Sequence, residues 1–427
     1  MLRCSRVNGS AVVLVCVLSV VVAVAASGAT SDWPQFRGAK GLGASADTGL
    51  PVSWGVDENM VWKVPLPGAG GSSPVILGER IFLTCFTGFK VPGEPGGTMD
   101  QLKRHVLCLR RSDGKTVWDK VVESRLPERS RIRTGHGYAS NTPATDGKRL
   151  YVFFGKSGVF AFDLDGRQLW HADVGSRLHG WGSAASPVVH GKLVIVNASI
   201  ESRSIVALDS KSGKEVWRAQ GIRDAWNTPV LVDVGGGKTE LVVGVPKKVL
   251  GIDPETGERL WSCDTGIGWY MVPSGATHRG VVYFAGGRSN DSLAIRAGGR
   301  GDVTASHRLW QLKKGSNVPS LLYHKGHVYW AHESGKVFCV DAKTGEIVYE
   351  ERLPRSDLIY PSPVLADGKI YYMSRRGRTF VVAASPEFKL LGTNELGRAG
   401  MFHASPAVVG GRLYIRSDKF LFCIGSK

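Results

Sequence analysis

Residues 186–218 read SPVVHGKLVIVNASIESRSIVALDSKSGKEVWR, and this stretch holds one complete unit of a pattern that recurs along the chain. Ser186-Pro187-Val188 opens the unit, two runs rich in β-branched residues follow, and Trp217 closes it. We predict four short strands separated by tight turns. The last turn contains Asp209 and Gly213, which suits it because Asp caps its own backbone and Gly adopts positive φ without steric cost.

The unit repeats about every 43 residues. Its prolines are spaced 69, 44, 42, 44, 46, 44 and 43 residues apart, at Pro74, Pro143, Pro187, Pro229, Pro273, Pro319, Pro363 and Pro406. The closing Gly-x-x-x-Trp also recurs, at Gly114/Trp118, Gly166/Trp170, Gly213/Trp217 and Gly257/Trp261, and as Gly345/Tyr349 with Tyr in place of Trp. This period indicates a β-propeller with one blade per repeat. We expect Trp170, Trp217 and Trp261 to be buried between neighbouring blades.

The two ends of the chain each contain part of one blade. The eighth repeat, which starts at Ser405-Pro406, ends without a Trp strand, whereas the strand around Trp62 has no blade before it. Pairing Trp62 beside residues 420–424 would close the ring and remove two open strand edges. We therefore predict an all-β, eight-bladed β-propeller of four-stranded blades, closed by pairing of the N- and C-terminal strands. It would span residues 59–427, with residues 30–58 as an N-terminal extension.

The first 29 residues have the pattern of a signal peptide. Arg3 and Arg6 precede an apolar run over residues 11–26, and small residues follow it. We expect export to the periplasm or the extracellular space.

The repeats resemble the pyrroloquinoline-quinone-like repeat family. The resemblance covers roughly residues 33–423 and is carried by strings such as Ala207-Leu208-Asp209 and by residues 341–345, 33–38 and 62–68. It is closest to the secreted, non-dehydrogenase members of that family, similar to the propeller subunit of the outer-membrane β-barrel assembly machinery. The resemblance implies the fold, but enzymes and scaffolds share this repeat, so it leaves the activity open.

Five cysteines follow the signal segment, and the repeats predict their state. Cys108, Cys339 and Cys423 occupy the place of Ala161, Ala207 and Gly251 in other repeats, a position for a small buried side chain. We expect unpaired core cysteines. The quinone-dependent alcohol dehydrogenases of the resembling family carry two adjacent cysteines near their cofactor, and this sequence has neither a Cys-Cys pair nor a Cys-x-x-Cys-His haem motif.

The loops that lead from one blade to the next should meet at one mouth of the channel. They contain the candidate funnel residues Trp181, Trp226, Trp269, Tyr270, Tyr360 and His403. Converging aromatic rings with a few polar groups are typical of a ligand site. The alternative is that the rings simply fill the channel, and the sequence leaves both open.

A basic loop is expected at the same mouth. It carries Arg125, Arg129, Arg131 and Arg133, and the whole chain has a formal net charge of +17. We expect this loop to bind a protein or an anionic polymer rather than nucleic acid, and we expect the protein to associate peripherally with the cell envelope. A merely solvated basic surface is the other interpretation.

Two functions follow. The favoured one is an exported, monomeric, non-enzymatic scaffold without a cofactor or metal site, because the Cys-Cys pair and the haem motif are missing. No nucleophile elbow, phosphate loop or His-Glu-x-x-His motif occurs either. The alternative is a quinone-dependent sugar or alcohol dehydrogenase with PQQ and calcium, the cofactor stacking in the funnel. Asp224 would then be the base and Arg223 its electrophilic partner, and Asp224, Asn227 and Asn317 are calcium candidates by location only.

Overall fold

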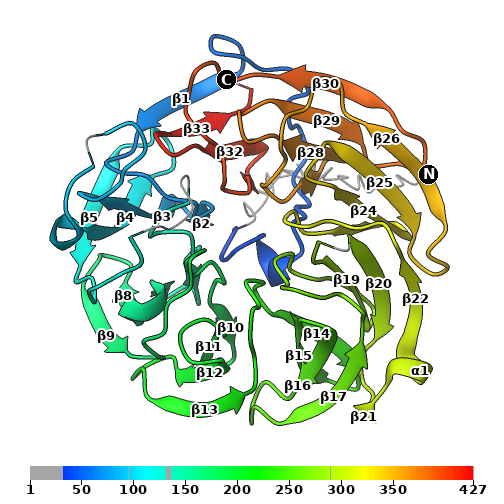
Figure 1. The fold of residues 1–427 in the computed structure, drawn as a ribbon. Coiled ribbons are helices and arrows are strands. Elements are labelled where there is room, and N and C mark those ends of the chain that lie inside the picture. Colours follow the sequence, from blue (N-terminus) through cyan, green and yellow to red (C-terminus); the bar gives the residue numbers. More distant parts are fainter. Residues whose placement is uncertain (1–31, 95, 131–135, 289, 427) are drawn as a thin grey trace, which may run out of the picture. The chain divides into compact units, whose positions relative to one another are not determined.

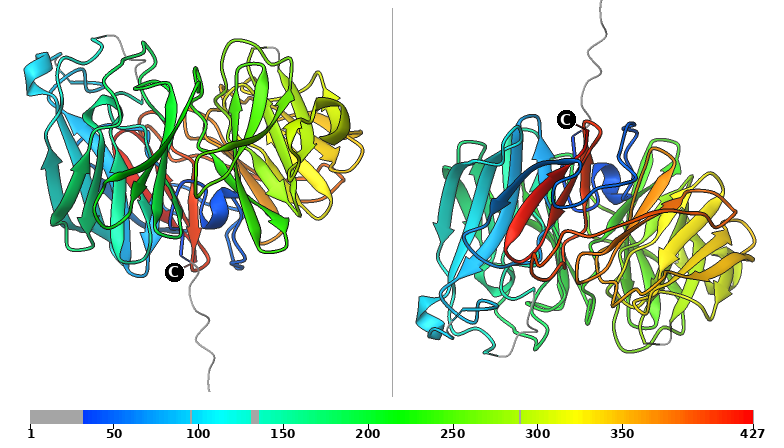
Figure 2. Two further views of the ribbon diagram at one scale, coloured as in Figure 1. Left: turned by 90° about the horizontal axis from the view of Figure 1, so that it is seen from below. Right: turned by 90° about the horizontal axis from the view of Figure 1, so that it is seen from above.

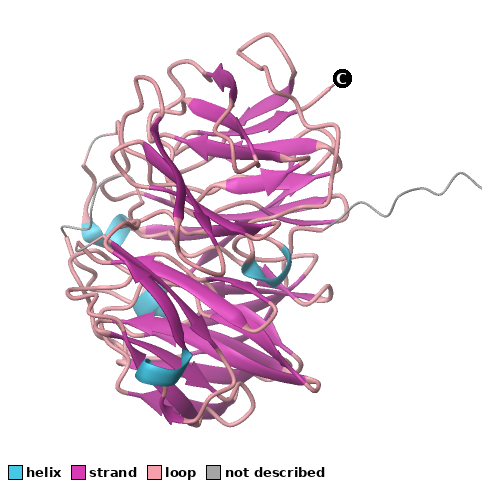
Figure 3. Ribbon diagram, turned by 90° about the vertical axis from the view of Figure 1, so that its right-hand side faces the viewer, coloured by secondary structure: helices cyan, strands magenta, loops and turns pink. Residues whose placement is uncertain are grey.

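Eight β-sheets surround a central channel in the computed structural model (Figure 1). The structure describes residues 32–94, 96–130, 136–288 and 290–426. The expected signal peptide lies outside the described residues. The prediction of an all-β, eight-bladed propeller is confirmed, and helices are few and short (Figure 3).

Blades 1 to 4 follow one another along the chain, and within each the strands run in order from the channel outward. Blade 1 contains β2 (Val75–Leu77), β3 (Arg80–Thr87), β4 (Lys103–Arg110) and β5 (Thr116–Val122). Blade 2 contains β6 (Ala144–Thr145), β7 (Arg149–Phe153), β8 (Val159–Asp163) and β9 (Gln168–Ala172). Blade 3 contains β10 (Val188–His190), β11 (Leu193–Ala198), β12 (Ser204–Asp209) and β13 (Glu215–Gln220). Blade 4 contains β14 (Val230–Gly235), β15 (Lys238–Val245), β16 (Lys248–Ile252) and β17 (Arg259–Asp264).

Blades 5 to 8 complete the ring. Blade 5 contains β18 (Ala276–His278), β19 (Val281–Gly286), β20 (Asp291–Arg296) and β22 (Arg308–Leu312). Blade 6 contains β23 (Leu322–His324), β24 (His327–Ala331), β25 (Lys336–Asp341) and β26 (Ile347–Arg352). Blade 7 contains β27 (Val364–Ala366), β28 (Lys369–Met373), β29 (Thr379–Ala383) and β30 (Leu390–Asn394). Blade 8 contains β31 (Ala407–Val409), β32 (Arg412–Arg416), β33 (Phe420–Ile424) and, from the other end of the chain, β1 (Met60–Pro65).

The short remaining elements lie between or beside the blades. They are the 3-10 helices η1 (Ala39–Gly41), η2 (Met99–Gln101) and η3 (Gly155–Ser157), the helix α1 (Thr304–His307) and the strand β21 (Gly301–Asp302). β21 adds to the outer edge of blade 4 by pairing in parallel with β17. Among the described residues, no helix is long and apolar enough to cross a membrane.

The ring closes as predicted. β1 pairs antiparallel with β33, and Trp62 lies opposite Cys423. The last blade is therefore built from both ends of the described chain, and β1 covers the outer edge of β33, which would otherwise be unpaired.

In blades 1, 2, 3, 5 and 8 the Trp of the outer strand packs on the Gly turn of the next blade. A Cβ atom on Gly213 would come within 2.6 Å of the Trp170 ring, and one on Gly257 within 2.5 Å of the Trp217 ring. The Trp170 Nε1–H donates to the carbonyl oxygen of Ser210 at 3.1 Å. Positive φ and the absence of a side chain are both needed at the turn, so Gly fits it. Trp170, Trp217 and Trp261 are buried, as predicted.

A small residue on the third strand faces each of these rings. Cys108 lies opposite Trp118, Ala207 opposite Trp217 and Gly251 opposite Trp261. The five cysteines of the described part, Cys85, Cys108, Cys263, Cys339 and Cys423, are buried and unpaired, so the prediction of unpaired core cysteines is confirmed.

Residues 32–58 cross one end of the channel instead of standing apart from the ring. Backbone hydrogen bonds join Trp33 to Ile76 of blade 1, and Ser45 to Leu365 of blade 7. Between these contacts the guanidinium of Arg37 donates to the carbonyl oxygen of Leu321 beside blade 6. Figure 2 shows this segment, in blue, on the axis near one end of the ring. We call residues 32–58 the floor segment.

Candidate functional site

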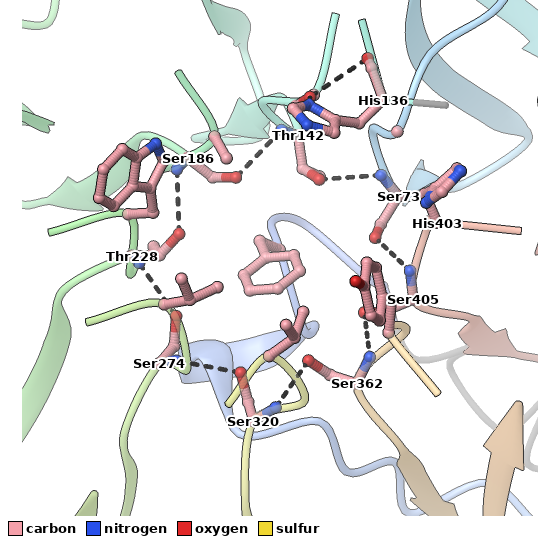
Figure 4. A pocket seen from close by; sticks show the side chains of 18 of the residues that line it. Ser73, His136, Thr142, Ser186, Thr228, Ser274, Ser320, Ser362, His403 and Ser405 are labelled. Carbon is pink, nitrogen blue, oxygen red and sulfur yellow. Dashed lines mark hydrogen bonds between the residues drawn. The ribbon is translucent and has the colours of Figure 1, made fainter. Parts of the chain in front are cut away.

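A closed circle of hydroxyl groups surrounds the channel axis (Figure 4). In each blade the backbone N–H of one Ser or Thr donates to the hydroxyl oxygen of its counterpart in the next blade, at 2.9–3.0 Å. The eight residues are Ser73, Thr142, Ser186, Thr228, Ser274, Ser320, Ser362 and Ser405. We call them the hydroxyl ring. It satisfies a buried backbone donor in every blade and ties each blade to the next.

The hydroxyl ring corrects the alignment of the repeats by their prolines. In six blades the ring residue precedes the proline, as in Ser186-Pro187, but in blades 5 and 6 Ser274 and Ser320 follow Pro273 and Pro319. The recurring group at the axis is therefore the hydroxyl, not the proline. The recurrence of Ser or Thr next to each proline was the signal in the sequence that could have identified it.

A cavity of about 220 Å³ lies on the axis inside this ring. Phe36 of the floor segment lines it, as do Gly71, Ser140, Ala184, Val272 and Val318. Its remaining lining consists of the hydroxyl ring together with His136, Trp181, Trp226, Tyr270, Asn317, Tyr360 and His403. No Asp, Glu, Lys or Arg is among these described lining residues.

The aromatic rings hold one another in place around this space. The centroids of Trp181 and Tyr270 are 4.7 Å apart with the rings edge to face, and those of Trp181 and Trp226 are 5.2 Å apart. The Trp226 Nε1–H donates to the carbonyl oxygen of Gly182 at 2.9 Å, and the Tyr270 hydroxyl donates to Asn317 Oδ1 at 2.9 Å. These ring contacts and hydrogen bonds position the aromatic side chains in the wall of the cavity.

His403 is neutral at physiological pH. Burial lowers its pKa to about 3, and the positive charges of Arg375, His136 and Arg416 act in the same direction. Its Nε2 atom is buried and has no hydrogen-bond partner. The guanidinium of Arg375 lies 4.5 Å from the centroid of Tyr360, outside the lining of the cavity.

The structure separates the candidate residues into two groups. Trp181, Trp226, Tyr270, Tyr360 and His403 line the cavity together. Trp269 does not: it is 72% exposed and lies beneath the guanidinium of Arg288, 5.3 Å from its ring centroid.

The candidates for enzyme chemistry do not converge on the cavity. Asp224 and Arg223 are exposed and do not line it. Asn227 is fully buried, and its amide bonds the backbone of Gly244 and Met271. Asn317 alone of the calcium candidates lines the cavity. Among the described residues no group of three or more His, Cys, Asp or Glu side chains could hold a metal ion.

The basic loop is fixed from beneath by a buried ion pair. Glu128 Oε1 accepts from Arg104 Nη2 at 2.6 Å, and both side chains are almost fully buried. Arg125 and Arg129 on either side are exposed, and Arg125 pairs with Asp173. Arg131 and Arg133 lie outside the described residues.

A second, smaller cavity of about 30 Å³ lies beside the loop and is lined in part by Arg104, Glu128, His179 and Glu201. Glu201 is 2% exposed and its Oε2 atom has no partner. Burial raises the pKa of Glu201 to about 7.

Glu201 should make the protein less stable as pH rises. The folded state keeps a proton that the unfolded state releases between the ordinary pKa of 4.5 and about 7, so unfolding becomes easier across that window. The loss amounts to on the order of 3 kcal/mol. We expect Glu201→Gln to unfold at higher urea concentration than the wild type at pH 8 and at a similar concentration at pH 4.5. The exposed Glu258→Gln is the control; equal midpoints for wild type and Glu201→Gln at pH 8 would contradict the prediction.

The family model for the outer membrane protein assembly factor BamB matches residues 61–228, 102–350 and 247–387. The outer membrane protein assembly factor BamB of Burkholderia pseudomallei (strain K96243) is 23% identical over 346 residues, which cover 76% of this chain and 80% of that protein.

Two solved structures show how widely the fold is shared. BamB from Moraxella catarrhalis has a TM-score of 0.61 at 16% identity, covering 86% of this chain and 97% of that one. The quinohemoprotein alcohol dehydrogenase of Comamonas testosteroni has a TM-score of 0.68 at 12% identity, covering 92% and 80%. At such identities these likenesses show the fold alone, and the fold does not separate a binding protein from an enzyme.

Proposed function

This chain belongs to the family of the outer membrane protein assembly factor BamB, and we propose that it is an exported, non-enzymatic propeller that binds protein partners in outer membrane protein assembly. The family match over residues 61–387 carries this proposal. The relative from Burkholderia pseudomallei, an assembly factor by name, supports it over most of both chains. We place the protein in the periplasm at the outer membrane, as a monomer.

The basic loop is the surface we assign to the partner. Arg125 and Arg129 are exposed, with Arg125 held by its ion pair with the exposed Asp173, while the buried Glu128–Arg104 pair fixes the backbone between them. A preorganised pair of cations favours an acidic protein face, and such charges mainly increase the association rate. An anionic polymer would satisfy the same charges without needing their spacing, so dependence on spacing distinguishes the two.

The dehydrogenase alternative requires donors that the cavity does not gather. PQQ carries three carboxylates, and calcium takes about six to eight oxygen ligands, usually with carboxylates among them. The described lining supplies neither a cation for the quinone nor a carboxylate for calcium. Asp224 and Arg223 lie outside the cavity, and the amide of Asn227 is used by the backbone. These residues do not fit the cofactor, which favours the binding protein.

Reversing the loop charges should weaken partner binding. We expect Arg125→Glu/Arg129→Glu to lose roughly 1–2 kcal/mol, about 5- to 30-fold in Kd at low salt, because each exposed pair contributes ~0.2–1 kcal/mol and reversal adds repulsion. The loss should shrink at high salt. Pull-down from envelope extracts, followed by titration of the purified partner, measures it.

The matched control reverses two cations at the opposite end of the blades. Arg167 and Lys211 are exposed on turns between the third and fourth strands, so Arg167→Glu/Lys211→Glu changes the net charge equally. If both double variants bind equally weakly, net charge rather than the loop governs binding. If neither loses affinity, the loop is not the partner surface.

A further inference from the structure

The hydroxyl ring keeps hydrogen-bonding capacity that the protein does not use. Each hydroxyl oxygen accepts one backbone N–H, as from Ser405 to Ser73 at 3.0 Å. Among the described residues, none of the eight hydroxyls donates to a protein acceptor. A hydroxyl has one donor and two lone pairs, so each keeps one donor and one lone pair for an occupant of the cavity.

One further polar side chain of the cavity lining, Asn317, also keeps hydrogen-bonding capacity that the protein does not use. Asn317 Oδ1 accepts from Tyr270, but no acceptor in the described residues takes the Asn317 Nδ2 protons. Buried polar groups normally find partners, so this concentration of unused capacity points to a ligand with its own donors and acceptors.

The walls add apolar faces to these polar groups. Phe36, Trp181 and Tyr360 contribute aromatic surface to the cavity. Its volume of about 220 Å³ is large enough for a ligand with one six-membered ring. This volume is below the roughly 300–1,000 Å³ of sites for drug-sized ligands.

We propose that the axial cavity binds one neutral, polyhydroxylated ring, that is, a single sugar residue. The hydroxyl groups of the sugar would donate hydrogen bonds to the hydroxyl ring of the protein and accept hydrogen bonds from it. The C–H faces of the sugar would lie against the aromatic walls of the cavity. This inference is independent of the proposed protein-binding role, which rests on the arginines of the basic loop.

A neutral ligand fits better than an anion. An anion accepts hydrogen bonds only, so it would leave the unused lone pairs of the hydroxyl ring unpaired. Burying an anion in the cavity would also require a cation to pair with it, and the described lining contains no Lys or Arg. His403 stays uncharged at neutral pH, because burial and nearby cations hold its pKa at about 3.

Calorimetry of the full-length mature protein with methyl glycosides of glucose, galactose, mannose and N-acetylglucosamine tests the proposal. We expect saturable, salt-independent binding of at least one glycoside. Trp181→Ala and Tyr360→Ala should each weaken it at least about tenfold. Trp269→Ala is the matched control, because this exposed rim tryptophan lies outside the cavity. The bound sugar could be a free monosaccharide or the terminal residue of a glycan, and oligosaccharides of the same sugars distinguish the two. Affinity equal to that of the methyl glycoside indicates a free monosaccharide, and tighter binding indicates the end of a glycan.

Glucuronate, citrate and inorganic phosphate are the comparison ligands. Binding of these anions without binding of any neutral glycoside would overturn the proposal, as would no saturable binding of any glycoside. A glycoside whose affinity falls equally in Trp181→Ala, Tyr360→Ala and Trp269→Ala would also overturn it, since the site would then lie outside the cavity. Unchanged melting temperatures in the variants ensure that lost binding reflects the site.

Discussion

Deleting residues 31–65 is expected to abolish the folded monomer. The deletion removes β1, so β33 loses its partner strand and blade 8 presents an unpaired edge. It also removes Trp33, Leu50 and Trp54, each at most 4% exposed in the core. Burying such a side chain contributes about 1.5–3 kcal/mol or more, and a domain has only about 5–15 kcal/mol in total. Size-exclusion chromatography with light scattering should show aggregates instead of a monomer.

A shorter deletion separates ring closure from the floor segment. Removing residues 31–58 keeps β1 and its pairing with β33 but opens the floor of the channel. We expect a monomer that unfolds at a lower temperature than the mature chain. A 31–65 deletion that melts cooperatively at the temperature of the mature chain would refute the closure argument.

The sequence predicted the parts of the fold that repeat. Closure by Trp62 could be inferred because one blade lacked its Trp strand and one Trp strand lacked its blade. The unpaired cysteines followed from the same alignment, because Cys108 and Ala207 share one position opposite a Trp ring.

The floor segment could not be predicted in this way because it follows no period. Its contacts join residues far apart in the chain: Arg37 and Leu321 are separated by 284 residues. Such contacts depend on the finished ring, not on local pattern. The segment nevertheless contributes to the site, because Phe36 lines the cavity.

The funnel was predicted in part, for a geometric reason. Trp226, Tyr270 and Tyr360 each lie three residues before a proline, and all three line the cavity. Trp269 is adjacent to Tyr270 but has φ 73°, and its ring is turned out to solvent. Composition cannot distinguish two neighbouring aromatic residues on a loop, whereas the backbone conformation does.

Trp261→Ala is expected to be the most damaging of the substitutions at the repeated tryptophans. Trp261 is 1% exposed, and Gly251 opposite leaves room for its ring. Its Nε1–H donates to Glu240 Oε2 at 2.7 Å, and Glu240 is itself 3% exposed. Removing the ring costs about 3–5 kcal/mol for the lost packing. Depriving the buried carboxylate of a donor adds roughly 1–3 kcal/mol. Urea unfolding at neutral pH measures the sum.

Three further variants separate the loss of packing from the loss of the hydrogen bond to Glu240 in this change of unfolding free energy. Trp217→Ala should lose about 3–5 kcal/mol, because its indole donates to the carbonyl oxygen of Pro254 rather than to a buried charge. Trp261→Phe keeps much of the packing but not the donor, so it reports the Glu240 contribution. Trp269→Ala, at an exposed site, should be nearly neutral. If Trp261→Ala is no more destabilising than Trp217→Ala, the bond to Glu240 adds nothing. In that case Gly298 and Arg300, which also bond Glu240, are sufficient to stabilise its charge.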